Sequence, residues 1–126
     1  MIGYQYVVLR VVPRVDREEF VNVGVVLYAQ AADLLQVRTH VDPARLRAFA
    51  PGVDVGAVRE SLAAIEAVCR GDRTRGLPHL DTLGRRFGWV SSPRSTVVQP
   101  GPVHGGLCED PESTLDGLAD RLVRTP

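Results

Sequence analysis

The N-terminal third of the chain alternates between apolar runs and short polar links, a pattern that predicts three β-strands. The runs cover residues 4–12, 20–29 and 34–41, and they are rich in β-branched and aromatic residues. Pro13 ends the first run, because proline cannot continue a central strand. The four-residue link 30–33 joins the second run to the third and predicts an antiparallel hairpin.

Alternation along these runs assigns side chains to the two faces of the predicted sheet, because successive residues of a strand point to opposite sides. The first run is mostly apolar on both faces, which favours a central strand, and Arg10 is its one charged member. In the second run, one face is expected to carry Asn22, Gly24, Val26 and Tyr28. The opposite face is expected to carry Val21, Val23, Val25 and Leu27.

Two longer helices are predicted by apolar residues that recur every three or four positions. The first follows the cap Asp54 and ends at Gly71. The second covers residues 111–124, where either Asp110 or Ser113 can act as the cap. Shorter predicted elements are a helix after Asp42-Pro43, a helix at 80–87, extended chain from Trp89, a strand at 94–99 and a long loop at 100–111.

Together these elements predict an α+β fold. We expect an antiparallel sheet of three or more strands with helices packed on one face. The helices at about 54–70 and 111–124 are expected to supply most of that cover. The length of 126 residues fits one domain with one core, so residues 1–126 are expected to form a single domain.

Composition and charge narrow the classes of function. The chain is 44% hydrophobic and 24% charged, as in ordinary soluble domains, and its 15 acidic and 15 basic residues give a formal net charge of zero. No global field attracts nucleic acid or an anionic membrane, so nucleic-acid binding is not favoured. No apolar run approaches the ~20 residues that cross a bilayer. We therefore expect a cytoplasmic protein without a membrane anchor.

Several kinds of catalytic chemistry lack their residues or motifs here. All 15 basic residues are arginine, which excludes Schiff-base lysine chemistry and a phosphate-loop lysine. Glycine-rich phosphate loops, dinucleotide fingerprints and paired Cys-x-x-Cys motifs are missing. The two cysteines, Cys69 and Cys108, are too few for a disulfide scaffold. We expect no cofactor and no metal site.

Two polar residues interrupt the apolar strands. Asn22 needs a hydrogen-bond partner if it is buried, and the favoured interpretation is a structural amide beside a bulge at Gly24. The functional alternative is an amide that binds a ligand or partner on the sheet face. Arg10 and Arg38 could join it there as an anion site, although salt bridges to Glu18 or Glu19 are favoured, because 15 acidic residues are available to 15 arginines.

A second candidate site is the segment from Ser92 to Thr96, which clusters hydroxyls around Arg94. This combination suits phosphate or carboxylate binding, but ordinary turns also use such hydroxyls to satisfy their own backbone. His104 lies in the long predicted loop, beside two glycines, and is the one weak candidate for a catalytic residue. A structural role for this histidine is favoured, because no nucleophile or second base is close in sequence.

Five short motifs occur in a characteristic order along the chain. They are Tyr6-x-x-x-Arg10-x-x-Pro13, Arg17-Glu18-Glu19-Phe20-Val21-Asn22-Val23-Gly24-Val25-Val26-Leu27, Arg86-Phe87-x-Trp89, Pro93-Arg94-Ser95-Thr96 and Val103-His104-Gly105-Gly106. This combination resembles, over nearly the full length, a bacterial family of small proteins known as domain of unknown function 3037 (DUF3037). The resemblance supplies no catalytic residues. The matched positions that it singles out are Arg10, Glu19, Asn22, Gly24, Arg94, Ser95 and His104.

The resemblance also implies a setting, since members of the family are often encoded beside a HipA-like kinase. One hypothesis is therefore a non-enzymatic partner or regulator that binds a kinase-like protein, or a second copy of itself, through the sheet face or the 100–111 loop. The alternative is a small-molecule or phosphate-handling enzyme that uses His104 with Arg94 and Arg10. That enzyme requires the three side chains to meet in one pocket.

Overall fold

The fold is seen in a computed structural model that describes residues 1–124. Residues 1–124 contain five strands and four α-helices. In chain order these are β1 (Ile2–Val11), β2 (Val21–Ala29), β3 (Leu34–Thr39), α1 (Pro43–Phe49), α2 (Val55–Arg70), α3 (Leu83–Ser91), β4 (Val98–Pro100), β5 (His104–Cys108) and α4 (Pro111–Leu122). The predicted α+β class is confirmed, as is the antiparallel sheet built around the first three strands.

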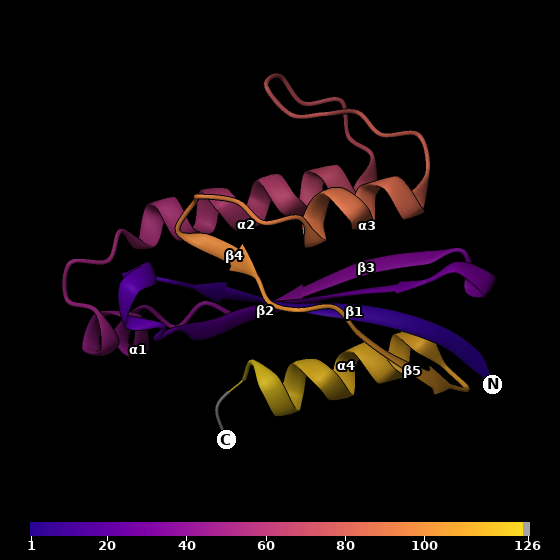
Figure 1. The fold of residues 1–126 in the computed structure, drawn as a ribbon, viewed down its shortest axis with the longest axis horizontal. Helices are drawn as coiled ribbons and strands as arrows, with labels where there is room; N and C mark the ends of the chain where they lie inside the picture. The colour runs from indigo at the N-terminus through magenta and orange to yellow at the C-terminus, as the bar shows by residue number, and fades with distance from the viewer. Residues whose placement is uncertain (125–126) are drawn as a thin grey trace.

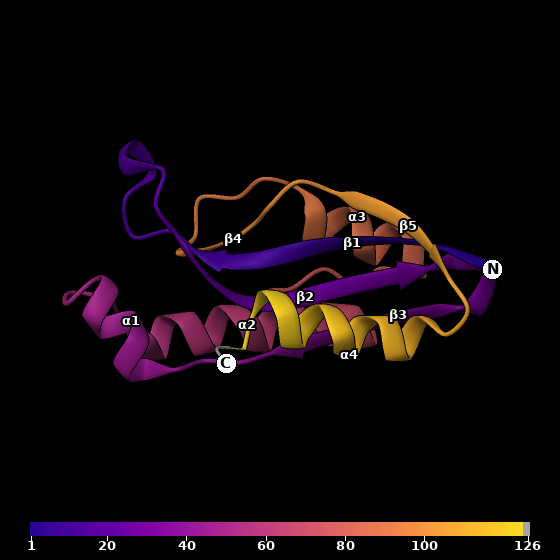
Figure 2. The ribbon, with the colours of Figure 1, turned by 90° about the horizontal axis from the view of Figure 1, so that it is seen from below.

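The sheet is centred on β1, the longest strand. Its hydrogen-bonded order is β3-β2-β1-β4, and β5 pairs with the same edge of β1 as β4 does. The short β4 pairs with Leu9–Val11, while β5 pairs with the residues from Ile2 to Tyr6. Every pair is antiparallel. Figure 2 shows β5 running along β1 on the side away from β2 and β3.

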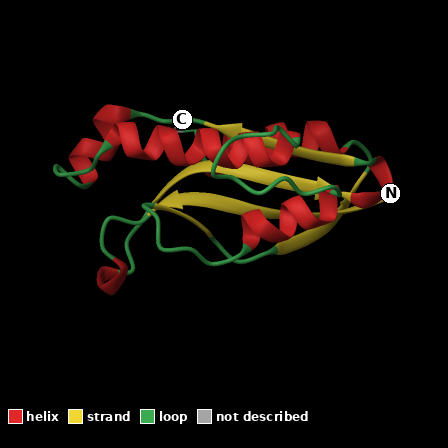
Figure 3. Cartoon of the chain, turned by 90° about the horizontal axis from the view of Figure 1, so that it is seen from above, coloured by secondary structure: helices red, strands yellow, loops and turns green. Residues whose placement is uncertain are grey.

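Helices cover both faces of this sheet, which corrects the expectation that they would pack on one face. In Figure 1, α2 and α3 lie above the strands and α4 lies below them. Figure 3, a view from above, shows α2 and α3 as red helices in front of the yellow strands. The buried residues accordingly form two clusters. One includes Val7, Leu9 and Ile65, and the other includes Leu27 and Leu115. Both faces of the sheet are therefore covered by helices, which is why both faces carry apolar side chains.

A β-bulge in β2 corrects the predicted alternation of that strand. Leu9 pairs with Gly24 but Arg10 pairs with Asn22, so Val23 is an extra residue in β2. Past the bulge the alternation is reversed, and Val25 joins the cluster under α4 while Val26 joins the cluster under α2 and α3. A Cβ on Gly24 would lie 3.2 Å from the Arg38 carbonyl oxygen, which favours glycine at this point.

The predicted helix caps are confirmed where a side chain makes them. Asp42, Asp54 and Asp110 each accept a hydrogen bond from a backbone N–H in the first turn of α1, α2 and α4. Gly71 ends α2 in the left-handed conformation, with φ of 77°. Between β1 and β2, Val15–Arg17 forms a single 3-10 turn, and the side chain of Arg14 before it does not cap it.

Three local predictions were wrong. The strand predicted at 94–99 is shorter and begins later, as β4 at Val98–Pro100. Trp89 and Val90 continue α3 instead of starting extended chain, because Thr82 caps a helix that begins later and runs further than predicted. The segment 100–111 is not a long loop, since its glycine-rich middle forms β5 against β1. None of the helices within residues 1–124 has the length and apolar character needed to cross a membrane.

Candidate functional site

The segment after α3 forms one wall of a cavity of about 320 Å³. Its opposite wall is α2, which contributes Ser61 and Ile65, while Trp89 and Arg94 come from α3 and the segment that follows it. Ser92 and Thr96 also line it, so the predicted hydroxyl cluster around Arg94 does border a cavity. Ser95, in contrast, is exposed and is absent from this lining.

Arg94 is held firmly at this wall. Its guanidinium stacks over the Trp89 ring at 4.3 Å, and Nη2 donates to the carbonyl oxygens of Trp89 and Val90 at 2.5 and 3.3 Å. These carbonyls are at the C-terminal end of α3, where a positive charge is favourable. Burial lowers the pKa of Arg94, and Nε is buried without a hydrogen-bond partner. Within residues 1–124 it forms no ion pair.

Arg10 lies on the other face of the sheet. It pairs in register with Asn22, whose Nδ2 donates to the Leu122 carbonyl oxygen at the end of α4, 3.0 Å away. The Arg10 guanidinium stacks over the Phe20 ring at 4.1 Å. Its Nε is also buried and has no hydrogen-bond partner in the part of the chain that the structure describes. The interpretation of Asn22 as a structural amide beside a bulge therefore gains support from the bond to α4.

Glu19 lies near Arg10 but forms its ion pair elsewhere. Both residues border a hollow of about 270 Å³ that Glu18 and Phe20 also line. The carboxylate of Glu19 accepts a hydrogen bond from Arg17. No ion pair joins Arg10 to Glu18 or Glu19 in the described part of the chain, so the aromatic ring, rather than an acid, is the neighbour that stabilises the Arg10 charge.

His104 is an exposed residue of β5 and lies apart from both Arg94 and Arg10. It is opposite Tyr6 in register and stacks on that ring at 5.1 Å between centroids. Tyr6 in turn stacks on Tyr4 at 6.2 Å. The imidazole therefore ends an aromatic ladder on the α4 side of the sheet, and no hydrogen bond of its ring occurs among residues 1–124.

The structure does not bring His104, Arg94 and Arg10 together. Arg94 lies on the α2 and α3 side of the sheet, whereas the other two lie on the α4 side. On that shared side, His104 is paired with Tyr6 of β1, and Arg10 is four residues further along the same strand. At the usual rise of a strand, the two positions are about 13 Å apart. The anion-binding enzyme that requires the three in one pocket therefore has no geometric basis.

The thiols are also poorly placed for chemistry. Cys69 and Cys108 are both free and buried. Burial raises the pKa of Cys69 to about 12, since desolvation disfavours the thiolate more strongly than Arg86 and Arg94 stabilise it. Among residues 1–124, no three His, Cys, Asp or Glu side chains gather closely enough to hold a metal ion.

The 100–111 segment, expected to be a partner-binding loop, presents a strand edge instead, the outer edge of β5. Within residues 1–124 this strand pairs only with β1, so its other side presents backbone N–H and C=O groups that no other strand there satisfies. Leu107 is 66% exposed and Val103, just before the strand, is 46% exposed. No charged residue occurs in β5, and two of its five residues are glycine. The sequence signal for this edge is weak: Val103 and Leu107 stand beside glycines, and a glycine-rich segment predicts a loop.

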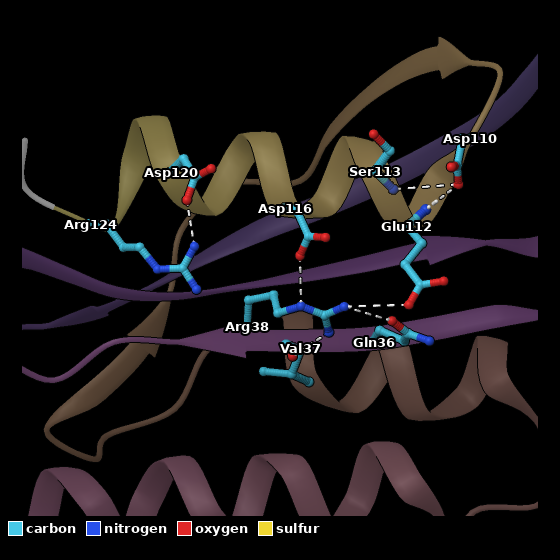
Figure 4. A network of polar contacts seen from close by, with 9 residues as sticks. All are labelled: Gln36, Val37, Arg38, Asp110, Glu112, Ser113, Asp116, Asp120 and Arg124. Atoms are coloured by element: carbon cyan, nitrogen blue, oxygen red, sulfur yellow. Dashed lines mark hydrogen bonds and ion pairs between the residues drawn. The ribbon is translucent and has the colours of Figure 1, made fainter.

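The opposite edge of the sheet, β3, is protected by contrast. Figure 4 shows Arg38 of β3 reaching Asp116 and Glu112 of α4, at 2.9 and 3.7 Å. The same guanidinium donates to the Val37 carbonyl oxygen on its own strand, at 3.1 Å. A charged side chain laid along an edge strand discourages pairing with another chain. The two edges therefore differ, and only β5 combines an open backbone with exposed apolar side chains.

Comparison with protein families gives a match over most of the chain. A family model described as "Protein of unknown function (DUF3037)" matches residues 6–123. A search of curated proteins found no match, and neither did a search of solved structures. The matched range runs from within β1 to the residue after α4, so it includes the Arg94 cavity and the β5 edge.

Proposed function

The chain belongs to the DUF3037 family, and from this premise we propose that it acts without catalysis, as a partner that binds another protein through the open edge of β5. The observation that carries this proposal is the contrast between the two sheet edges. β3 is covered by the Arg38 network, whereas β5 offers unpaired backbone groups beside the exposed Leu107. Addition of a partner strand to such an edge is a common way of binding an extended segment.

The geometry of β5 suits an added strand. Its glycines, Gly105 and Gly106, present little side-chain bulk to an approaching backbone. On one side of β5, Val103 and Leu107 alternate with Gly105, so an incoming strand would bury two aliphatic groups as well as form hydrogen bonds. We propose that the partner is a HipA-like kinase, because the family resemblance places such a kinase beside members of this family.

The kinase experiment uses a matched pair of variants. Leu107→Lys adds a charge to the exposed β5 edge, and Val15→Lys adds the same charge at an equally exposed aliphatic residue, 71% exposed, in the 3-10 turn. The purified protein is mixed with the HipA-like kinase encoded nearest to its gene, and binding is followed by interferometry and by size-exclusion chromatography with light scattering. We expect Leu107→Lys to weaken binding about tenfold or more, and Val15→Lys to leave it unchanged.

Three outcomes contradict the proposal. The first is a wild-type protein that binds no such kinase, and the second is equal weakening by both variants. The third is a wild-type homodimer that Leu107→Lys dissociates, since the occupant of the β5 edge would then be a second copy of this chain. Circular dichroism of each variant verifies that the fold is retained.

A further inference from the structure

The cavity beside Arg94 has the size of a site for a small ligand and is separate from the β5 edge. Its volume of about 320 Å³ lies at the lower end of the range of roughly 300 to 1,000 Å³ that small-molecule sites occupy. Its walls are mainly apolar, with Ile65, Leu77, Trp89 and Pro93 among them. A ligand with an apolar body would therefore be buried favourably there.

Arg94 makes this cavity attractive to an anion. The guanidinium is partly desolvated, it has no acidic partner within residues 1–124, and the cavity lining contains no aspartate or glutamate. The Nη2 contacts with Trp89 and Val90 leave Nη1 without a hydrogen-bond acceptor in the described chain, while Nε is unpaired but buried from solvent. A half-buried charge whose donors are unpaired gains more from an anion than an exposed arginine does.

The hydroxyls decide which kind of anion fits. Ser92 Oγ donates to the Gly88 carbonyl oxygen and Thr96 Oγ1 to the Val98 carbonyl oxygen, each at 2.7 Å. Each hydroxyl has one hydrogen, so these two can only accept further hydrogen bonds. Ser61, whose hydroxyl makes no hydrogen bond within residues 1–124, is the one hydroxyl free to donate. Arg94 and Ser61 together match the two oxygens of one carboxylate, whereas a phosphate presents three oxygens and up to two charges.

We propose that this cavity binds a small monocarboxylate with an apolar body, its carboxylate accepting hydrogen bonds from Arg94 and Ser61. The apolar body would lie between Ile65 and the Trp89 ring. The proposal does not rest on partner binding at β5, because the two sites share no residue. Its failure would leave the β5 proposal intact, and the reverse also holds.

The first test uses only the wild-type protein and four probes. Phenylacetate is titrated into the isotope-labelled protein while amide chemical shifts are followed, and phenylacetamide, acetate and phenyl phosphate are titrated in parallel. We expect saturable shifts with phenylacetate at the cavity residues, and affinities about tenfold weaker or worse for phenylacetamide, which lacks the charge, and for acetate, which lacks the apolar body. Phenyl phosphate is expected to bind no more tightly than phenylacetate.

The second test identifies the residues. Arg94→Gln removes the charge at the cavity, and Arg85→Gln is the matched control, because Arg85 is an exposed residue of α3. Ser61→Ala removes the free hydroxyl, and Ala64→Leu fills the cavity while Arg94 is kept, so a variant remains if Arg94→Gln fails to fold. We expect weaker phenylacetate binding in all three cavity variants and wild-type binding in Arg85→Gln.

Several results would overturn this assignment. They are the absence of saturable shifts with phenylacetate up to about 10 mM, equal binding of phenylacetamide, tighter binding of phenyl phosphate, and wild-type affinity in Ala64→Leu. Shifts that map away from the cavity would do the same. A graded loss across the cavity variants, with the charged probe preferred over its neutral analogue, would support it.

Discussion

Three half-buried side chains, Arg10, Asn22 and Arg94, each keep one buried polar atom without a hydrogen-bond partner in residues 1–124. Each side chain makes another contact that offsets part of the cost of the unpaired atom. The two guanidiniums stack on aromatic rings, and the amide of Asn22 donates to a carbonyl that the end of α4 would otherwise leave unpaired. Polar residues that interrupt apolar segments are thus held by this fold at some cost, which makes them sensitive positions.

At Asn22 we predict that two variants differ in stability in the way expected if the amide donates a hydrogen bond and does not merely fill space. Asn22→Ala removes the hydrogen bond to Leu122 and should lower the free energy of unfolding by about 1 kcal/mol. Asn22→Asp keeps the size but places a carboxylate oxygen against that carbonyl, and should cost about 3 kcal/mol. Urea denaturation measures both, with Gln30→Ala, an exposed amide, as the control. An aspartate variant as stable as wild type would show that the Asn22 amide is not a donor to α4.

Among the elements, β5 contains two neighbouring glycines that differ in the space around them. Tyr4 lies across Gly106, so that a Cβ at Gly106 would be 2.6 Å from the Tyr4 hydroxyl, whereas the nearest atom to a Cβ at Gly105 is 3.5 Å away. Neither glycine has a positive φ. The requirement at Gly106 is therefore space for an aromatic ring, and it links β5 to the aromatic ladder on β1.

The two neighbouring glycines of β5 provide a matched comparison. Gly106→Ala should displace the Tyr4 ring and lower the free energy of unfolding by about 1 to 2 kcal/mol. Gly105→Ala should be neutral or slightly stabilising, because it meets only ordinary contact distances and reduces the entropy of the unfolded chain. Urea denaturation of both variants tests this. Equal effects would show that the strand tolerates a displaced Tyr4.

At the scale of the whole molecule, one sheet separates two apolar cores. Residues such as Ile65 pack on the α2 and α3 side, and Leu115 packs on the α4 side. Both are almost fully buried, at 2% and 0% exposure. The strands between them contribute side chains to both cores, so the two cores should unfold together even though their helices do not meet across the sheet.

This arrangement predicts independent costs within a single transition. Ile65→Val should cost about 0.5 to 1.5 kcal/mol and Leu115→Ala about 2 to 5 kcal/mol. Since the two side chains lie on opposite faces, the double variant should show the sum within about 0.5 kcal/mol. Denaturation followed by tryptophan fluorescence and by circular dichroism should give coincident curves. Separate transitions would contradict both cooperative unfolding and the expectation of a single domain.

The positions of most elements follow from local chemistry, and the sequence by itself determined them. Asp42, Asp54 and Asp110 cap their helices through bonds to the next few residues, and Gly71 ends α2 by its own backbone freedom. The segments that form β1 and β2 are apolar on both faces, so their strand character can be recognised without knowing their neighbours in the fold. Such preferences involve residues close in sequence, so the pattern of the chain reveals them.

Only the tertiary structure decided the features that depend on partners distant in sequence. The bulge at Val23, the placement of α4 opposite α2, and the pairing of the 104–108 segment with β1 each require knowing what lies across the sheet. The candidate site divides in the same way. The residue types around Arg94 indicated an anion site, but the separation of Arg94 from Arg10 and His104 followed from which face each occupies. A linear pattern cannot contain that information, because a single extra residue in a strand exchanges its faces.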